Sequence, residues 1–377
     1  MNRSMMRRLQ YALIPAVALS LGGCLGGAKL AHAKTPSLPL SSEVPRVTLV
    51  STTRELGAAP RSTYSAIRVG PHGDVLMAEM PGERGILRIV DSTGHLRLSF
   101  GRQGEGPGEA RGPSPLAITD TSVLAFDLGT LRLSQWDSKG RILGMLSTDI
   151  PVFPLAQALD GRWVAASSSS TMAPVELDPR TLLAHRLLSP NDSFYRQLRP
   201  PPGDPHSNLP PVLGVWEQGF IVANGATYRL GLYDWNGQLR HVLSRSLPAN
   251  TPTLQYVNTQ VMQLRTSLGA NGNRRSPAEL ERIRSRASHT PRDWFSHVSP
   301  LGLDQHGRIW VAGPEGDSAF VDVFNTEQFL GRIHVPCRGF ANRWAMQGHW
   351  LAMVCAPDDE SFDGDAVVKL FRLEEAR

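Results

Sequence analysis

The sequence predicts an all-β fold, a six-bladed β-propeller, on three observations. A pair of short apolar strands joined by a tight turn recurs six times along the 377 residues. A third strand follows each pair, and most of these third strands end on Asp or Asn or run straight into a turn. Four strands and about 40 residues per unit match a propeller blade. Such repetition decides the architecture, because one unit cannot bury its apolar face alone.

The repeats can be followed along the whole chain after the N-terminal segment. The strand pairs are predicted at 67–79, 116–127, 155–167, 212–224, 301–313 and 343–355. The third strands are predicted at 86–91, 131–137, 173–178, 229–234, 320–325 and 367–373. Three of the turns that follow carry a glycine, at Gly94, Gly140 and Gly237, which adopts positive φ without strain. A fourth strand then completes the unit.

The last unit supplies only three strands before the sequence ends. A propeller must cover its free sheet edges, so a fourth strand has to come from elsewhere. Residues 46–56 (RVTLVSTTREL) alternate as a strand does and precede the first unit. We therefore expect this N-terminal strand to pair with 367–373 and close the ring.

The N-terminus predicts export. Arg3, Arg7 and Arg8 precede a short apolar stretch that ends in Leu-Gly-Gly-Cys24, a pattern typical of a signal peptide rather than a spanning helix. This ending resembles the bacterial lipobox, which implies lipid attachment at Cys24; the alternative is an ordinary secretory signal cut after residues 31–33. Leu25 after the cysteine points to the outer membrane.

The predicted organisation is a lipoprotein signal peptide at 1–23, a flexible tether at 24–45 and a propeller at 46–376. Loss of the signal removes three basic residues and no acidic ones. The mature chain would keep 36 Lys and Arg against 34 Asp and Glu, a net charge of +2. The high pI is then largely a property of the signal, so nucleic-acid binding is not expected.

Two cysteines remain after Cys24. Cys337 lies at the end of the fifth unit and Cys355 at the end of the second strand of the sixth. An exported compartment permits a disulfide, but sequence cannot show whether the two Cα atoms come within bonding range. A disulfide and two buried thiols both remain open.

Two segments carry a resemblance to a known family. Residues 101–109 (GRQGEGPGE) and 126–137 (FDLGTLRLSQWD) resemble the G-R-x-G-x-G-P-G-E and D-x-G-N-x-R-I-x-x-F-D segments of bacterial six-bladed β-propeller lipoproteins, relatives of the NHL-repeat and TolB-like groups. Thr130 and Trp136 depart from the usual Asn and Phe. The resemblance implies the fold, and it implies no activity, because binding proteins, lactonases and lyases share this fold.

No compact catalytic signature is present. The chain has no H-E-x-x-H, C-x-x-C or G-x-S-x-G, and 101–109 lacks the Lys of a phosphate-binding loop. Aspartates recur near strand ends, at Asp120, Asp127, Asp137, Asp160 and Asp234; they are interpreted as turn caps, the alternative being a cation site. No catalytic, cofactor or metal residue is predicted. The alternative is a lactonase-like hydrolase or lyase with calcium or zinc on the central axis.

The long connection at 247–298 is the clearest departure from the repeats. Loops of this length are usually functional or disordered. Ser276-Pro277-Ala278-Glu279 forms a capping box that starts a helix, and a second helix is predicted from Thr251. The two helices are expected to pack across one face of the ring. Four basic residues of the segment are the predicted partner contacts, the alternative being a solvated helical face without a partner: Arg274, Arg275, Arg282 and Arg286.

These observations predict an exported, lipid-anchored propeller that acts as a binding or scaffold module in the cell envelope, most simply as a monomer. Its partner would be a protein, an acidic glycan or an acidic lipid, because the insertion is basic.

Overall fold

The computed structural model divides the chain into two units, Met1–Thr35 and Pro36–Arg377. The first unit, with the predicted signal peptide, Cys24 and part of the tether, lies outside the described residues. The structure describes residues 44–53, 63–80, 86–127, 129–147, 152–158, 162–167, 173–178, 183–198, 212–248, 250–254, 257–258, 261, 275–289, 293–295, 301–315, 318–337, 343–355 and 367–374.

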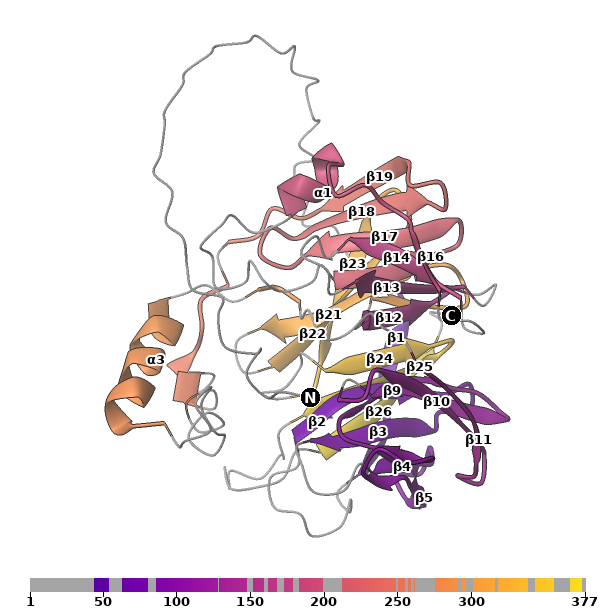
Figure 1. The fold of residues 1–377 in the computed structure, drawn as a ribbon. Helices are drawn as coiled ribbons and strands as arrows, with labels where there is room; N and C mark the ends of the chain where they lie inside the picture. Colours follow the sequence, from indigo (N-terminus) through magenta and orange to yellow (C-terminus); the bar gives the residue numbers. More distant parts are fainter. Residues whose placement is uncertain are drawn as a thin grey trace, which may run out of the picture. The chain divides into compact units, whose positions relative to one another are not determined.

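Six four-stranded antiparallel sheets form the blades (Figure 1). Blade 1 comprises β2 (Thr63–Val69), β3 (Val75–Met80), β4 (Leu87–Val90) and β5 (Leu96–Phe100), and blade 2 comprises β8 (Pro113–Ile118), β9 (Ser122–Asp127), β10 (Arg132–Asp137) and β11 (Ile142–Ser147). Blade 3 comprises β12 (Val152–Gln157), β13 (Trp163–Ser167), β14 (Pro174–Leu177) and β15 (Ala184–Arg186), and blade 4 comprises β16 (Val212–Trp216), β17 (Gly219–Asn224), β18 (Arg229–Asp234) and β19 (Leu239–Ser244). Blade 5 comprises β20 (Gly302–Leu303), β21 (Ile309–Glu315), β22 (Ser318–Phe324) and β23 (Phe329–Val335), and blade 6 comprises β24 (Trp344–Gln347), β25 (Trp350–Cys355), β26 (Val367–Glu374) and β1 (Arg46–Thr53).

The blades follow one another around a closed ring. The first strands of neighbouring blades contact each other, as in β2 with β8 and β16 with β20, and β24 of blade 6 contacts β2 of blade 1. The core lies between blades: Ile67 and Val75 of blade 1 pack with Ala352 and Val354 of blade 6. The six-bladed propeller predicted from the repeats is therefore confirmed. The ring is stable because each sheet buries its apolar faces against the next sheet.

The N-terminal strand closes blade 6, as predicted. Strand β1 pairs antiparallel with β26, with Arg46 opposite Glu374 and Thr53 opposite Val368. The register shifts between Leu49 and Ser51, which makes Val50 a bulged residue. The sheet order β1-β26-β25-β24 therefore joins the two ends of the repeat array.

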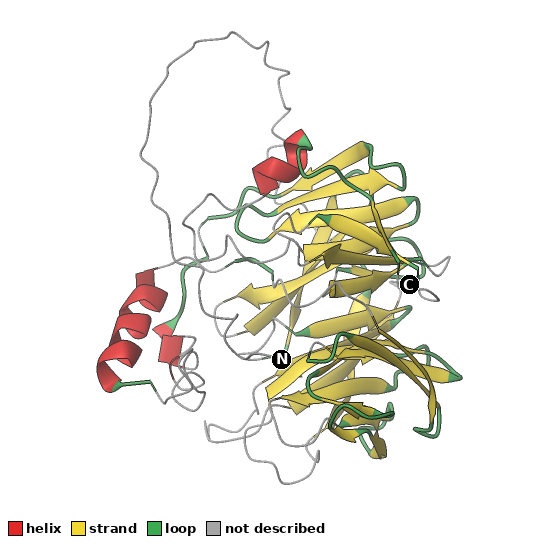
Figure 2. Ribbon diagram, in the orientation of Figure 1, coloured by secondary structure: helices red, strands yellow, loops and turns green. Residues whose placement is uncertain are grey.

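The antiparallel order gives the ring two different ends. The connections between blades, and the turns from second to third strands, lie at one end, which we call the loop end. The hairpin turns from first to second and third to fourth strands lie at the opposite end, the turn end. Helices α1 (Ser193–Leu198) and α3 (Pro277–His289) belong to blade-to-blade connections, and both lie on the same side of the sheets (Figure 2).

Tight turns terminate the strands where the sequence places glycine. Gly94, Gly140 and Gly237 have φ values of 93°, 77° and 76°, a conformation in which a Cβ would be strained. Asp137 accepts hydrogen bonds from the backbone N–H groups of Lys139 and Arg141 in one of these turns. The predicted role of the strand-end aspartates as turn caps is confirmed at this position.

Candidate interaction surface at the loop end

The insertion between blades 4 and 5 is attached to the ring by a buried charged group. Asp322, in the middle of β22, has no exposed side-chain surface. Its carboxylate accepts hydrogen bonds from Arg245 at 2.6 Å and from Arg332 at 2.7 and 2.9 Å, and also from the Tyr228 hydroxyl. Arg245 follows β19 directly and precedes the insertion by two residues, so this contact fixes to blade 5 the point where the chain enters the insertion.

Tyr228 is held in an unusual conformation at this group. Its φ is 46°, a region that is strained for a bulky residue. Burial, and then the neighbouring carboxylate of Asp322, raise the pKa of Tyr228 well above its usual value, so the hydroxyl remains protonated and donates its hydrogen bond. The two guanidinium groups that contact Asp322 also pack on aromatic rings. The guanidinium of Arg245 lies 3.9 Å from the ring centre of Phe329, and that of Arg332 lies 3.7 Å from the ring centre of Phe320.

The end of the insertion is anchored over the same two blades. The backbone N–H of Trp294 donates to the carbonyl of Gly225 at 2.9 Å. Trp294 and the neighbouring Phe295 are buried in the apolar cluster between blades 4 and 5. A Cβ on Gly225 would lie 2.5 Å from the Phe295 carbonyl oxygen, so only glycine permits this approach.

The two ends of the insertion also contact each other. The side-chain amide of Asn250 donates to the carbonyl oxygen of Asp293 at 3.3 Å, and Asn250 is buried. Both ends are therefore held by the ring and by one another, and the segment between them begins and ends at defined positions.

The helix predicted from Thr251 is only partly described. Leu254, Val257, Asn258 and Val261 are helical. Val257 and Val261 are buried, whereas Leu254 is 73% exposed. The valines, four residues apart, share one helix face and direct it toward the protein.

The helix predicted from the capping box at Ser276 is α3. It begins at Pro277, and the Ser276 hydroxyl accepts a hydrogen bond from the backbone N–H of Glu279 at 3.2 Å, so the predicted N-cap is confirmed. None of its side chains is buried. We expected this helix to pack across one face of the ring. In the structure the three apolar residues on one side, Leu280, Ile283 and Ala287, are only half-buried, because they are too few to form a broad apolar face.

The opposite side of α3 is basic. Arg282, Arg286 and His289 are spaced at i, i+4 and i+7, which places them in one stripe, and all three are exposed. We call these residues the basic stripe. Arg286 and His289 lie in the last turn, where the helix dipole favours positive charge. The stripe thus faces away from the half-buried apolar side.

The other two predicted contact residues differ from the stripe. Arg275 precedes the helix, its side chain is only 17% exposed, and its Nε lies 3.8 Å from the Glu279 carboxylate. It therefore offers little charge to a partner. Arg274 lies outside the described residues.

The glycine-rich connection of residues 101–112 also lies at the loop end and is internally braced. The Glu109 carboxylate accepts from Gly106 N–H and from Arg102 Nε, each at 2.7 Å, and these contacts, led by the Gly106 N–H, lower the pKa of Glu109. A Cβ on Gly104, whose φ is 150°, would collide with the same carboxylate. The expected bend between blades is therefore an ordered loop that includes a short parallel pair, β6 (Arg102–Gln103) with β7 (Glu109–Ala110).

The two segments that resemble the lipoprotein family meet in space. Buried Asp127 accepts hydrogen bonds from the backbone N–H groups of Arg111 at 3.0 Å and Gly112 at 2.7 Å, and from the Thr130 hydroxyl at 2.6 Å. Arg132 donates to the carbonyl of Glu105. These residues hold the connection on blade 2, so a structural role accounts for them.

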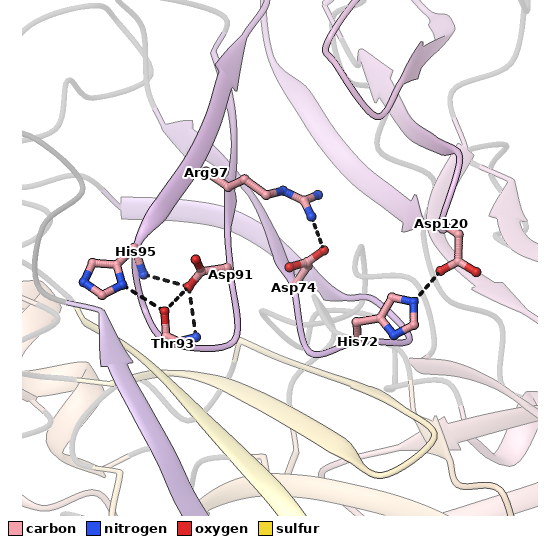
Figure 3. A network of polar contacts seen from close by, with 7 residues as sticks. All are labelled: His72, Asp74, Asp91, Thr93, His95, Arg97 and Asp120. Atoms are coloured by element: carbon pink, nitrogen blue, oxygen red, sulfur yellow. Dashed lines mark hydrogen bonds and ion pairs between the residues drawn. The ribbon is translucent and has the colours of Figure 1, made fainter.

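A shallow pocket of about 540 Å³ lies at the turn end between blades 1 and 2. His72 Nε2 lies 3.1 Å from Asp120 Oδ1 of the next blade, and Arg97 lies 2.7 Å from Asp74 (Figure 3). The side chains of His72 and Asp120 are 75% and 66% exposed, so the pair contributes little energy. The Asp74 carboxylate already pairs with Arg97 and the Asp120 carboxylate contacts His72, which makes this pocket the weaker candidate site.

The third set of polar contacts in Figure 3 belongs to the turn at Asp91. The Asp91 carboxylate accepts from the Thr93 hydroxyl at 2.6 Å and from the backbone N–H groups of Thr93 and His95 (Figure 3). The Thr93 hydroxyl first, and these N–H groups, lower the pKa of Asp91. This is a turn cap of the kind predicted for the strand ends.

The predicted cation alternative finds no assembled ligand set in the described part of the chain, where no three His, Cys, Asp or Glu side chains are grouped to hold a metal. Asp127, Asp137 and Asp234 each accept local backbone N–H groups, and Asp120 pairs with His72. Asp160 lies outside the described residues.

The two late cysteines are joined. The structure contains a disulfide between Cys337 and Cys355, with Cα atoms 5.0 Å apart. It links the segment after β23 to the end of β25. None of the described helices is long and apolar enough to cross a membrane.

The sequence did not identify the Asp322 group. The signal was present, because an Asp inside an apolar strand (Phe320 to Phe324) must be paired if it is buried. Its partners Tyr228 and Arg245 lie 94 and 77 residues away, which no local pattern could predict.

Comparison with solved structures supports the fold. A DUF4221 family member from Bacteroides vulgatus aligns over 88% of this chain and 99% of its own, with a TM-score of 0.52 and 11% identity. BamB from Moraxella catarrhalis aligns over 87% and 100%, with a TM-score of 0.39 and 14% identity, and virginiamycin B lyase from Staphylococcus aureus over 85% and 98%, with 0.43 and 8%. At these identities the likeness concerns the fold alone. No protein-family model and no curated protein matches the chain.

Proposed function

We propose that this chain is an exported, lipid-anchored propeller that serves as a binding or scaffold module in the cell envelope. The insertion at 247–298 is its contact surface, and its partner is an anionic protein, glycan or lipid. The observation that carries the proposal is the exposed basic stripe of α3, on a segment whose two ends are anchored to the ring.

Anchoring the insertion lowers the entropic cost of binding. Attaching both ends of the insertion to a rigid ring reduces the conformational entropy lost on binding. The arginines of the stripe are exposed, so they attract an anionic partner at a distance set by the salt concentration. The lipid anchor at Cys24 would hold this surface in the envelope, and its expected location is the outer membrane.

Charge reversal of the stripe tests the proposal. Arg282→Glu with Arg286→Glu should abolish crosslinking to the partner in the native envelope, because attraction becomes repulsion. Arg186→Glu with Arg196→Glu, on β15 and α1, changes the charge equally at exposed positions and should leave crosslinking intact. Undiminished crosslinking of the stripe variant would contradict the proposal, provided that its melting temperature is unchanged.

Two further measurements separate the parts of the proposal. Cys24→Ala should release the protein from the membrane fraction; continued detergent-dependent fractionation would refute the anchor. Metal analysis of the purified chain addresses the hydrolase or lyase alternative, which stoichiometric calcium or zinc would favour.

A further inference from the structure

The shallow pocket between blades 1 and 2 lies at the turn end and has a mixed lining; we call it the turn-end pocket. Leu98 and Ile118 supply apolar surface, and Thr119 and Ser138 supply hydroxyl groups. Besides His72, its ionisable side chains are two cations and two carboxylates: Arg97, Lys139, Asp74 and Asp120. Its volume of about 540 Å³ is within the range of about 300–1,000 Å³ that small-molecule sites occupy.

A small residue stands on the rim of this pocket where another blade has a tryptophan. In blade 2 the Asp137 carboxylate accepts from the backbone N–H groups two and four residues later, and in blade 4 the Asp234 carboxylate does the same. The two turns from third to fourth strand therefore have the same hydrogen bonds. Ser138 of blade 2 is thus the structural equivalent of Trp235 in blade 4.

The equivalent space between blades 3 and 4 is occupied by side chains. In the first hairpin turn of blade 1, the Gly70 N–H donates to the carbonyl of Asp74 at 2.7 Å. In blade 3 the Ala158 N–H donates to the carbonyl of Arg162 at 2.8 Å, so Arg162 and Asp74 are equivalent. The guanidinium of Arg162 lies 3.7 Å from the ring centre of Trp235, a close cation–π stack. One backbone frame therefore holds two stacked side chains between blades 3 and 4, and an open pocket between blades 1 and 2.

The charges of the turn-end pocket favour a neutral ligand. Its two cations and two carboxylates cancel when His72 is counted as neutral. Asp74 already pairs with Arg97 at 2.7 Å, and Asp120 contacts His72 at 3.1 Å (Figure 3). A charged ligand would have to separate a carboxylate from its partner. A ligand hydroxyl can instead donate to the carboxylate and accept from the cation while the pair remains intact.

We propose that the turn-end pocket binds a neutral saccharide. A sugar carries several neighbouring hydroxyl groups, which suit the Arg97–Asp74 pair and the nearby donor Lys139. It also has an apolar C–H face, which suits the exposed surface of Leu98 and Ile118. This site is independent of the basic stripe, because the pocket lies at the turn end and the insertion at the loop end.

Titration of the purified full-length chain, followed by saturation-transfer NMR, tests the ligand class. At least one of N-acetylglucosamine, glucose and maltose should bind, with a millimolar dissociation constant because the pocket is shallow. Inorganic phosphate and the zwitterion alanylalanine should not displace it. Absence of binding by all three sugars overturns the proposal, and displacement by phosphate or alanylalanine would assign the pocket to a charged ligand instead.

Three variants locate the site. Ser138→Trp gives blade 2 the residue of blade 4, and it should abolish sugar binding without lowering the melting temperature. The matched control is Ser92→Trp in blade 1, where Asp91 makes the same turn contacts; it should leave binding unchanged. Lys139→Ala should weaken binding about tenfold, while the turn keeps its bond from the Lys139 backbone N–H. Sugar binding that survives Ser138→Trp, or that is lost equally in Ser92→Trp, overturns the assignment.

Discussion

Asp322 shows how one residue joins two blades. Its charge is removed from water and is balanced by Arg245, which lies between β19 and the insertion, and by Arg332 of β23, while Tyr228 of blade 4 donates a further hydrogen bond. Taking one partner from a buried ion pair costs more than the pair itself contributes, because the remaining charges stay buried. The same residue therefore governs both local stability and the attachment of the proposed contact surface.

Asp322→Ala should lower the free energy of unfolding by about 3–5 kcal/mol, since two nearly buried guanidinium groups lose their counter-ion. Tyr228→Phe removes one hydrogen bond and should cost about 1–3 kcal/mol. Denaturant unfolding of both variants measures the two values. A loss for Asp322→Ala no larger than that for Tyr228→Phe would show that the arginines find other partners.

The aspartates in the turns should make the stability of the protein depend on pH. The backbone N–H of Arg141 first lowers the pKa of Asp137, and that of Gln238 first lowers the pKa of Asp234. Because the folded values lie below the unfolded value of about 3.9, this stabilisation is complete above that pH and is lost as the pH falls through the folded values.

Melting temperatures of the wild type and of the Asp137→Asn, Asp234→Asn variant, measured from neutral pH to below pH about 3.9, should therefore converge on acidification. A constant difference across the range would mean that these carboxylates do not contribute through ionisation.

Strand β1 is the element on which ring closure depends. It covers the edge of β26 over its whole length, from Arg46 opposite Glu374 to Thr53 opposite Val368. Partly buried Val47 also packs on the cluster shared by blades 5 and 6. Without β1, blade 6 would expose both an apolar surface and a free edge.

Deletion of residues 44–53 should lower the melting temperature and promote aggregation. Calorimetry together with light scattering would measure both. As a control, replacing the same residues by an unrelated alternating strand sequence should restore part of the stability, because pairing with β26 depends mainly on backbone hydrogen bonds. An unchanged melting temperature after deletion would refute closure by β1.

At the scale of the whole molecule, stability depends on blades being held in sequence around the ring. The Cys337–Cys355 disulfide spans a sequence separation of 18 residues and lies in the core between blades 5 and 6. It acts in the blade where β1 pairs with β26 and closes the ring, so it restrains the point of closure.

Removal of both cysteines, by Cys337→Ala with Cys355→Ala, should cost about 3 kcal/mol, because the unfolded chain gains loop freedom. The thermal shift of the wild type on adding reductant should approach that of the variant. A variant as stable as the oxidised protein would show that packing alone holds this region.

Local patterns predicted most of the fold but little of the candidate site. Alternating apolar residues indicate strands, and turn glycines such as Gly140 mark where the strands end, because both signals act within a few residues. The capping box at Ser276 likewise predicted the start of α3. The contacts of Tyr228 with Asp322, and of Trp294 with Gly225, depend on which loops lie side by side at the loop end, and no spacing in the sequence encodes that.

The number of blades, the closing strand β1 and the basic insertion could all be predicted from local patterns, because periodicity and composition are properties of neighbouring residues. Folding adds that Arg282 and Arg286 are exposed while Arg275 is largely covered, and that Asp322 lies against Arg245 and Tyr228. Exposure and register arise from the lateral packing of segments far apart in sequence, so they exist only once the ring has closed.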